Sequence, residues 1–348
     1  MYIREVSRRW VDLGHEVYLI CANYDGGSRF DCLEGVKVSR VGNRFSVYPE
    51  AMLQYLAAYT GKVDVVIDAI NTIPFLTPLY VPKMRCAALV FQITREIVFS
   101  ELPRIPASVF YIFEPILYKL YQSVPVLVLS ESVKRDLTNF GFLTEKIFVV
   151  EPGVDHEPFQ TSQKTANPSI IFMNRLARYK NVSHLVKAFS IVKDTIPNSK
   201  LSIAGCRGGK YEQQIRNLVD SLGLSHDVKF YGFVKNRLKR ELLGNAWIHV
   251  LPSIREGWGI SVTEAAACGT PTVAYDVVGI RDSVRDGETG FLVPFGRIDL
   301  LANRIIQVLS NDSLRESLSE NALSRAKTHT WNATAKNALN AIATSIGV

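Results

Sequence analysis

The sequence has no hydrophobic run long enough to cross a membrane. Its longest stretch without a charged residue, residues 69–82, has 14 residues and is interrupted by prolines, whereas a membrane-spanning helix needs about 20 predominantly apolar residues. The first ten residues, MYIREVSRRW, contain no apolar stretch like that of a secretory signal peptide. We therefore expect a cytoplasmic protein, with attachment at the inner face of the membrane as the alternative.

Cysteine is scarce, and no two cysteines lie close together in the sequence. The five residues are Cys21, Cys32, Cys86, Cys206 and Cys268. An odd number of scattered thiols argues against a disulfide framework and against a zinc site with closely spaced ligands. We expect a reducing compartment and no metal.

An acidic excess is also absent. Lys and Arg number 40 against 33 Asp and Glu, which gives a net charge of +7. A basic balance favours anionic ligands, such as phosphates or an anionic lipid surface. The basic residues are dispersed and no nucleic-acid-binding motif accompanies them, so we expect no nucleic-acid partner. With 348 residues, the chain is long enough for two domains of ordinary size.

Short apolar runs alternate with segments of helical periodicity along the chain, which predicts an α/β protein with parallel sheets covered on both faces. In the first half, strands are expected at residues 16–22, 35–41, 63–69, 85–91, 125–129 and 147–150, and helices at 1–13, 49–60 and 130–140. The polar segment 157–168 contains two prolines and marks a domain boundary. The pattern then restarts, with strands at 169–173, 200–204, 228–231, 247–251, 272–275 and 290–293, and helices at 181–193, 211–222, 236–243, near 280 and from about 297 onward.

Residues 99–122 are rich in Phe, Tyr, Ile and Leu and contain three prolines. Helices lying on a membrane or lining an acceptor channel are one interpretation. We favour core or lid helices, because Glu114 and Lys119 do not build a basic polar face.

Residues 251–264, LPSIREGWGISVTE, place Glu256 and Glu264 eight positions apart, with glycines between them and a helix expected to follow. Glycine lets a ligand approach the main chain, and the first turn of a helix offers N–H groups to a phosphate. With a carboxylate on each side to hold hydroxyl groups, the stretch suits a phosphorylated sugar or a nucleotide sugar. The alternative is purely structural: Ser261 and Glu264 match a capping box, and Glu256 is then a solvated turn residue.

The second half resembles the retaining, metal-independent glycosyltransferases of family GT4, whose two Rossmann-like domains face each other across a cleft (the GT-B fold). The resemblance rests on Asn174-Arg175-Leu176 with Lys180-Asn181, Ile203-Ala204-Gly205, Val228 to Gly232, Pro252 to Pro271, and Gly279 to Gly290. In the first half it is weaker and rests on residues 14–17, 130–136 and 152–155. It implies domains at 1–157 and 168–329, with a helix at 330–348 crossing back to the first domain.

The resemblance also implies roles for single residues. Arg175 and Lys180 would neutralise the donor diphosphate as it leaves; read without the surrounding pattern, they are two surface cations. Glu256 would hold hydroxyls of the transferred sugar, and Glu264 the two ribose hydroxyls. Further donor contacts would come from Gly257, Trp258, Gly259, Ile260, Gly205, Gly232, Phe233 and Val234. The implied reaction moves a hexose from a UDP-, GDP- or ADP-sugar to a saccharide or lipid-linked acceptor with retention, and needs neither metal nor cofactor.

The sequence departs from the family's pattern at three places. Family members begin with a strand and a glycine-rich loop ahead of the first helix, whereas Met1 already lies at that helix. We therefore expect an incomplete N-terminal sheet and a reading frame that starts upstream. Phe91 stands where the family commonly has a histidine that contacts the sugar, and Asn174 where glycine is usual. Phe91 and the missing loop motivate an alternative to the transferase, a non-catalytic paralogue that binds nucleotide sugar as a partner subunit or sensor. A nucleotide-sugar epimerase of the same fold is a third hypothesis.

Overall fold

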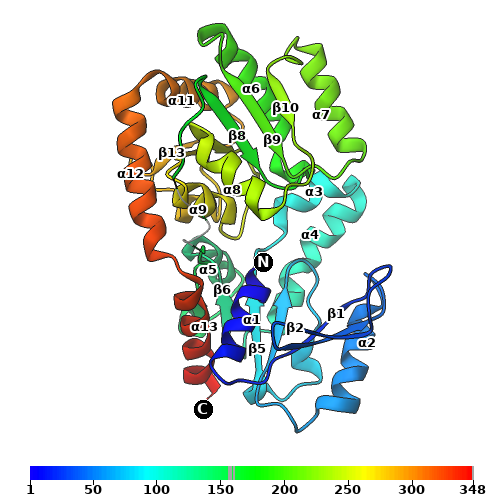
Figure 1. Ribbon diagram of the computed structural model, residues 1–348. Coiled ribbons are helices and arrows are strands. Elements are labelled where there is room, and N and C mark those ends of the chain that lie inside the picture. Colours follow the sequence, from blue (N-terminus) through cyan, green and yellow to red (C-terminus); the bar gives the residue numbers. More distant parts are fainter. Residues whose placement is uncertain (156–158, 160, 347–348) are drawn as a thin grey trace. The chain divides into compact units, whose positions relative to one another are not determined.

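The computed structural model describes residues 1–155, 159 and 161–346, and the chain divides into two compact units (Figure 1). Unit 1 comprises Met1–Thr94, Tyr111–Pro152 and Trp331–Val348, and unit 2 comprises Arg95–Phe110 and Gly153–Thr330. Unit 2 thus includes Arg95–Phe110, which lies inside the range 1–157 that the sequence assigned to the first domain. Residues 157, 158 and 160 of the expected boundary, and 347–348 of the expected last helix, lie outside the described residues.

Unit 2 is built on a six-stranded sheet in which every neighbouring pair is parallel. Its order is β10-β9-β8-β11-β12-β13. The strands are β8 (Ser169–Met173), β9 (Lys200–Ala204), β10 (Val228–Phe230), β11 (Ile248–Leu251), β12 (Thr272–Tyr275) and β13 (Gly290–Val293). All six lie close to the positions expected from the sequence, because short, continuous apolar runs are typical of a sheet buried on both faces.

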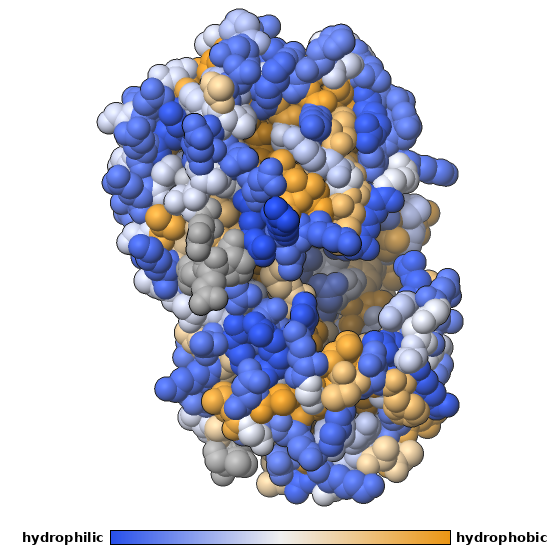
Figure 2. All heavy atoms as spheres, viewed as in Figure 1, coloured by the Kyte–Doolittle hydropathy of each residue, from blue (hydrophilic) through white to orange (hydrophobic). Residues whose placement is uncertain are grey.

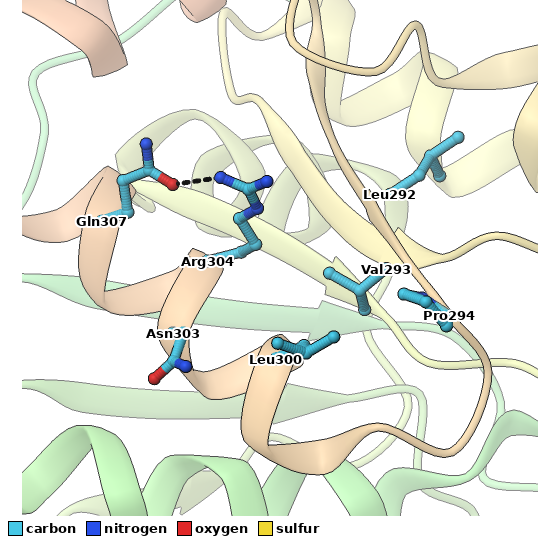
Figure 3. Close-up of a pocket in the computed structure, with 7 residues that line it drawn as sticks. All are labelled: Leu292, Val293, Pro294, Leu300, Asn303, Arg304 and Gln307. Atoms are coloured by element: carbon cyan, nitrogen blue, oxygen red, sulfur yellow. Dashed lines mark hydrogen bonds between the residues drawn. The ribbon is translucent and has the colours of Figure 1, made fainter.

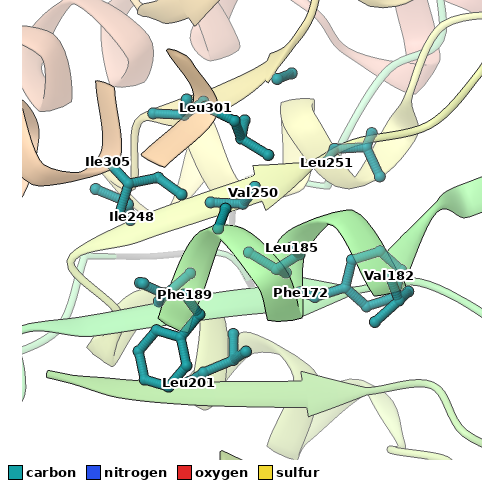
Figure 4. Packing of buried hydrophobic residues seen from close by; sticks show 14 of the residues in the cluster. Phe172, Val182, Leu185, Phe189, Leu201, Ile248, Val250, Leu251, Leu301 and Ile305 are labelled. Carbon is teal, nitrogen blue, oxygen red and sulfur yellow. The ribbon is translucent and has the colours of Figure 1, made fainter. Parts of the chain in front are cut away.

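Helices cover both faces of this sheet, and strand β8 shows how. Ile170 and Phe172 belong to the cluster that contains α6 and α11, whereas Ile171 and Met173 pack in the cluster that contains α8 and α9. Figure 4 shows the larger cluster, with Phe189 of α6 and Ile305 of α11 directed at the strands. Side chains alternate between faces along a strand, so an uninterrupted apolar run contributes to two cores.

The helices of unit 2 are α3 (Val98–Glu101), α6 (Val182–Thr195), α7 (Lys210–Ser221), α8 (Asn236–Asn245), α9 (Ile260–Ala267), α10 (Ile280–Ser283), α11 (Ile298–Ser310) and α12 (Asp312–Thr328), with short 3-10 turns η4 (Arg95–Ile97) and η6 (Arg178–Lys180).

Unit 1 contains two sheets rather than one. The first has the order β1-β3-β2 and the second β4-β5-β6-β7, so β1 and β4 are each an edge strand. The interruption expected for the N-terminal sheet is therefore present. The strands are β1 (Tyr18–Ala22), β2 (Phe30–Leu33), β3 (Val36–Val41), β4 (Val66–Ile70), β5 (Cys86–Val90), β6 (Val126–Val128) and β7 (Ile147–Val149).

Strand β2 was not predicted, and it pairs antiparallel with β3. Its residues Phe30 and Leu33 are 66% and 49% exposed. A strand with no buried face lacks the apolar pattern on which sequence reasoning depends. This hairpin adds an antiparallel pair to sheets that are otherwise parallel among the described residues, as expected.

The helices of unit 1 follow the expected order with two differences. The helix expected at 49–60 consists of α2 (Val47–Gln54) and a π-helical turn η1 (Tyr55–Tyr59), and residues 99–122 form two helices, α3 and α4 (Arg104–Lys119). Residues 104–110 of α4 belong to unit 2 and the rest to unit 1. The remaining elements are α1 (Tyr2–Asp12), η2 (Thr77–Leu79), η3 (Lys83–Arg85), α5 (Glu131–Asn139), η5 (Thr144–Lys146) and α13 (Trp331–Ile346). Among the described residues, no helix is both long and apolar enough to cross a membrane.

Candidate functional site

The loop between β11 and α9 holds Glu256 in a fixed position. Glu256 is 7% exposed, and its Oε1 atom accepts hydrogen bonds from Lys180 Nζ at 2.5 Å and Ser253 Oγ at 2.7 Å. The interpretation of Glu256 as a solvated turn residue is therefore wrong. A buried carboxylate with two charge-assisted or polar partners is held rigidly in its place.

Gly279, just before α10, makes this loop geometry possible. Its φ is +81°, and a Cβ atom at this position would lie 2.3 Å from the backbone oxygen of Glu256. The Glu256 N–H donates to the backbone oxygen of Val278 at 3.0 Å. Only glycine allows two backbones to approach so closely. Gly279 was part of the family resemblance but was not predicted as a site residue.

Lys180 and Arg175 lie on either side of Tyr179, in the segment after β8. Lys180 is 3% exposed, and its Nζ lies 4.8 Å from the centre of the Tyr179 ring. Arg175 is exposed and donates from Nη2 to the Tyr179 hydroxyl at 2.9 Å. Lys180 is therefore not a surface cation, and Tyr179, which was not predicted, links the two cations.

The segment Arg95–Phe110 joins unit 2 through two of its acids. Glu96 forms an ion pair with Arg255 at 3.0 Å, and Glu101 accepts a hydrogen bond from the Tyr179 N–H at 3.4 Å. Both partners lie beside Glu256 or Lys180 in the sequence. Sequence reasoning placed this segment in the first domain, because contacts between residues far apart in the sequence leave no local pattern.

Helix α9 begins at Ile260 with Gly259, at φ +91°, as its N-cap. The capping-box interpretation is therefore wrong, because Ser261 is already inside the helix. The hydroxyl of Ser261 is buried and has no hydrogen-bond partner among the described residues. Such an orphan polar group calls for an explanation, and in the first turn of a helix, whose N–H groups attract negative charge, it suits an anion.

Trp258 serves the structure of this loop. It is 2% exposed, donates from Nε1 to Thr263 Oγ1 at 2.8 Å and packs against His329 with ring centres 5.5 Å apart. Its side chain is therefore a packing element. Any donor contact at Trp258 is therefore left to its backbone.

Glu264 on α9 is paired with Lys239 on α8, whose Nζ donates to Glu264 Oε1. The two side chains are only 4% and 15% exposed. Burial raises the pKa of the Glu264 carboxyl, and the charge of Lys239 opposes that rise. Sequence reasoning missed Lys239, because it lies on the preceding helix and no sequence spacing links it to Glu264.

The remaining predicted residues follow β9 and β10. Gly205 directly follows β9, and its N–H donates to the backbone oxygen of Gly232 at 2.7 Å. Phe233 is 62% exposed with the Arg207 guanidinium 4.6 Å from its ring centre, whereas Val234 packs in the cluster shared with α8. The structure thus brings Gly205 and Gly232 together, leaves Phe233 available to a ligand, and makes Val234 a core residue.

A surface pocket elsewhere in unit 2 contains none of the predicted residues. It has a volume of about 200 Å³ and lies between β13 and α11 (Figure 3). Its lining consists of Leu292, Val293, Pro294, Leu300, Asn303, Arg304 and Gln307. We locate the candidate site from the buried charges, because this pocket has a single cation, Arg304, already bonded to Gln307 at 2.6 Å.

Comparison with known proteins agrees with this arrangement. The model of the Glycosyltransferase Family 4 domain matches residues 1–158, and that of the Glycosyl transferases group 1 domain matches residues 154–325. The chain belongs to the family 4, group 1 glycosyltransferases. The α/β architecture with parallel sheets is that of the GT-B glycosyltransferases, as solved structures show. Sucrose-phosphate synthase of Thermosynechococcus elongatus aligns with a TM-score of 0.82 over 97% of this chain and 91% of its own, at 20% identity.

Two further proteins are similar to this glycosyltransferase chain. HepE of Anabaena, solved in complex with UDP and glucose, aligns with a TM-score of 0.78 at 16% identity over 99% of this chain and 95% of its own. The poly(glycerol-phosphate) alpha-glucosyltransferase of Bacillus subtilis is 28% identical over 218 residues, which are 62% of this chain and 32% of that protein. The chain therefore spans about a third of the length of this curated relative.

Phe91, which stands where the family commonly has a histidine, lies in an aromatic cluster of unit 1. Its ring meets that of Tyr2 edge-on with centres 5.6 Å apart, and Tyr2 meets Trp331 in the same way at 5.7 Å. Burial raises the pKa of the Tyr2 hydroxyl far above its usual value. Phe91 is therefore a packing residue, and its side chain can donate neither a proton nor a hydrogen bond.

Proposed function

We propose that unit 2 binds a nucleoside-diphosphate sugar and that the protein transfers its hexose to a saccharide or lipid-linked acceptor with retention of configuration. The observation that carries the proposal is the cluster of Lys180, Glu256 and the start of α9. Two side chains there are buried and charged, and the adjacent Ser261 hydroxyl has no partner among the described residues. Buried charges are costly to keep, so their concentration at one loop favours a binding role over a structural one.

The diphosphate is expected to lie against the cations and the start of α9. An ammonium has three donors, so Lys180 can keep Glu256 and bind a phosphate oxygen at the same time. Arg175, exposed and oriented by Tyr179, supplies a planar pair of donors for a second oxygen. These positive groups stabilise the charge that develops on the leaving group.

The transfer step needs no other reactant. The bond between the anomeric carbon and the diphosphate oxygen breaks, and its electron pair stays on that oxygen. The acceptor hydroxyl oxygen bonds to the same face of the carbon, and its proton passes to the departing diphosphate. Glu256, fixed by Lys180 and Ser253, would hold hydroxyls of the transferred sugar throughout.

Glu264 would hold the ribose of the donor. A carboxylate has two acceptor oxygens, and Lys239 bonds to Oε1. Binding two ribose hydroxyls therefore requires Lys239 to share or release that oxygen. We infer that donor binding rearranges the Lys239–Glu264 pair, which a ligand-induced shift of Lys239 resonances would report.

Two similar proteins support the substrate classes. HepE was solved with UDP and glucose, and the Bacillus relative is named for transfer of glucose to poly(glycerol phosphate). We infer the same class of donor for this chain and a hydroxyl-bearing saccharide or lipid-linked acceptor. We infer also that the reaction needs no metal, so excess EDTA should leave turnover unchanged.

A binding panel of UDP-, GDP- and ADP-sugars tests the proposal directly. We expect one nucleotide class to bind and Lys180→Met to lower turnover by roughly 10²- to 10³-fold, because a charge at the leaving group is lost. Lys187→Met is the matched control, since Lys187 is an exposed lysine on the neighbouring helix α6. No binding of any donor by the full chain, or equal losses in the two variants, would contradict the proposal.

Phe91 supports a second candidate, a non-catalytic protein that binds nucleotide sugar as a partner subunit or sensor. Its ring packs edge-on against Tyr2 and cannot donate a hydrogen bond. This candidate predicts donor binding with no turnover on any acceptor. Detected transfer that Lys180→Met abolishes would exclude it.

A further inference from the structure

Unit 2 has a row of exposed cations beyond three neighbouring strands. Because β8, β9 and β10 are parallel neighbours, the loops that follow them lie at one edge of the sheet. The cations of these loops, which we call the rim, are Arg178, Arg207, Lys210, Lys235 and Arg237. All five are exposed, and none of them forms an ion pair with another residue that the structure describes.

The three loops that carry the rim are in direct contact. Gly205, after β9, has a φ of +104°, and an added Cβ would lie 2.1 Å from the backbone oxygen of Asn174, after β8. The N–H of Gly205 donates to the backbone oxygen of Gly232, after β10, at 2.7 Å. The rim cations therefore belong to one continuous surface.

Two guanidinium groups of the rim lie over aromatic rings. The Cζ atom of Arg178 is 5.6 Å from the centre of the Tyr211 ring, and that of Arg207 is 4.6 Å from the centre of the Phe233 ring. Such a contact orients a guanidinium and leaves the N–H groups in its plane free to bind an anion. Both arginines are thus prepared to bind pairs of oxygen atoms, as in a phosphate.

Acidic residues do not offset the charge of this region. Residues 205–241 contain eight Lys and Arg against four Asp and Glu. Among these acids, Glu212 accepts from the Gly208 N–H at 2.8 Å and pairs with Arg216 at 2.8 Å, and Asp227 pairs with two lysines outside the rim. Figure 2 shows strongly hydrophilic side chains, in deep blue, over α8. A surface with an excess of one charge sign attracts ligands of the other.

We propose that the rim binds a linear polymer with a phosphate group in each repeat. This polymer is a part of the acceptor away from the reacting hydroxyl, a statement that rests on the proposed transferase function. Cations spread over three loops suit repeated, separated anions better than one compact anion. The donor diphosphate is expected nearer to α9, which follows β11 on the other side of β8 from the loops after β9 and β10.

Two other occupants are less favoured. A bilayer surface calls for apolar side chains beside the cations, whereas of the two rings at the rim only Phe233 is exposed, at 62%. Single-stranded nucleic acid calls for aromatic faces on which bases stack, whereas Tyr211 and Phe233 each have a guanidinium over the ring. A phosphate polymer without bases or lipid chains therefore fits best.

Calorimetric titration of the full chain with a ten-unit glycerol phosphate oligomer, without donor, tests the proposal. We expect binding that weakens as salt is added, because bound cations are released from the polymer. Arg178→Gln and Arg207→Gln should each weaken binding roughly fivefold, and the double variant roughly 25-fold, with a shallower dependence on salt. An uncharged dextran oligomer of similar length should not bind.

Matched controls remove exposed cations elsewhere in unit 2. Arg297→Gln removes an arginine that is already paired with Asp299, and Lys187→Gln removes an exposed lysine of α6. Both variants should bind the oligomer like the unmodified protein. Circular dichroism and thermal unfolding of every variant show whether the fold is kept.

Donor titrations separate this inference from the proposed function. The rim variants should keep the donor affinity of the unmodified protein, and Lys180→Met should keep the affinity for the oligomer. Donor binding without oligomer binding would refute the rim proposal alone. Oligomer binding without binding of any donor would refute the proposed function and leave the rim as a polymer site.

Four further outcomes would overturn the proposal. The first is oligomer binding that the rim variants weaken no more than the controls do. The second is displacement of the oligomer by UDP, GDP or ADP, which would assign the rim to the donor. The third is tighter binding of a ten-nucleotide oligodeoxythymidine than of the glycerol phosphate oligomer. The fourth is tighter binding of vesicles that contain phosphatidylglycerol.

Discussion

At the scale of single residues, the candidate site depends on two lysine–glutamate pairs, Lys180–Glu256 and Lys239–Glu264. All four side chains are at most 15% exposed. Desolvation makes each charge expensive to bury alone, whereas each pair satisfies both partners. Removing one partner is therefore expected to cost far more than removing an exposed charge.

We predict that Lys239→Met lowers the free energy of unfolding by about 3 kcal/mol, because Glu264 is left buried without its counter-charge. Urea denaturation measures the change. Lys235→Met, at an exposed position just before α8, should change it by less than about 0.5 kcal/mol.

The double variant Lys239→Met/Glu264→Gln separates the pair from its surroundings. Removing both charges should recover more than half of the loss seen with Lys239→Met. A double variant as unstable as the sum of the two single variants would show that the two side chains do not interact.

His249 gives a prediction for the effect of pH. It lies in β11, fully buried, with Nδ1 3.1 Å from Thr272 Oγ1 and no partner for Nε2 among the described residues. Burial lowers its pKa to about 3 in the folded protein, against about 6.5 in the unfolded chain. The unfolded state therefore takes up a proton that the folded state does not, and this contribution to stability, present above pH about 6.5, is lost as pH falls toward about 3.

The measurement compares unfolding free energies of the unmodified protein and His249→Gln. Between pH 7.5 and 5.5 the unmodified protein should lose about 1.4 kcal/mol more than the variant. The exposed His226→Gln should lose as much as the unmodified protein. Parallel pH profiles for His249→Gln and the unmodified protein would refute the assignment.

At the scale of elements, backbone contacts rather than side chains position the loop before α9. Gly279→Ala would place a methyl group 2.3 Å from the Glu256 oxygen, at a φ of +81°. We predict a loss of at least about 3 kcal/mol of unfolding free energy and weaker donor binding, because the loop must move.

Gly287→Ala is the control for Gly279→Ala. Gly287 has a similar φ of +75°, but an added Cβ meets nothing within 4 Å. Gly287→Ala should lower the free energy of unfolding only by the strain of the left-handed conformation, about 1–2 kcal/mol, and should leave donor binding intact. Equal effects of the two substitutions, measured by thermal unfolding and donor titration, would show that the approach to Glu256 is unimportant.

At the scale of the whole molecule, the two ends of the described chain meet in unit 1. Helix α13 packs against α1, with Trp10 Nε1 donating to the Ala335 oxygen at 2.9 Å and Thr334 Oγ1 to the Glu151 oxygen at 2.8 Å. Trp331, 2% exposed, is buried against Tyr2. The last helix of the chain thus contributes to the core of the first unit.

We predict that Trp331→Ala destabilises unit 1 by about 3–5 kcal/mol, the range for emptying a large aromatic core position. Urea unfolding followed by circular dichroism measures it. Asn337→Ala, at an exposed site on the same helix, should stay within about 0.5 kcal/mol. Unchanged stability in Trp331→Ala would mean that α13 can leave without cost to unit 1.

The sequence by itself determined the order of strands and helices, the α/β class and most residues of the candidate site. Apolar runs and periodicity are local properties, so they showed the six strands of unit 2, and the glycine-flanked motif named Glu256 and Glu264. Tertiary structure alone decided which charges meet: Lys239 pairs with Glu264, Glu96 with Arg255, and Glu114 turns inward on α4. It also showed β2 and the cap at Gly259. These features depend on contacts between distant parts of the chain, and a pattern in one short segment holds no record of what the segment packs against.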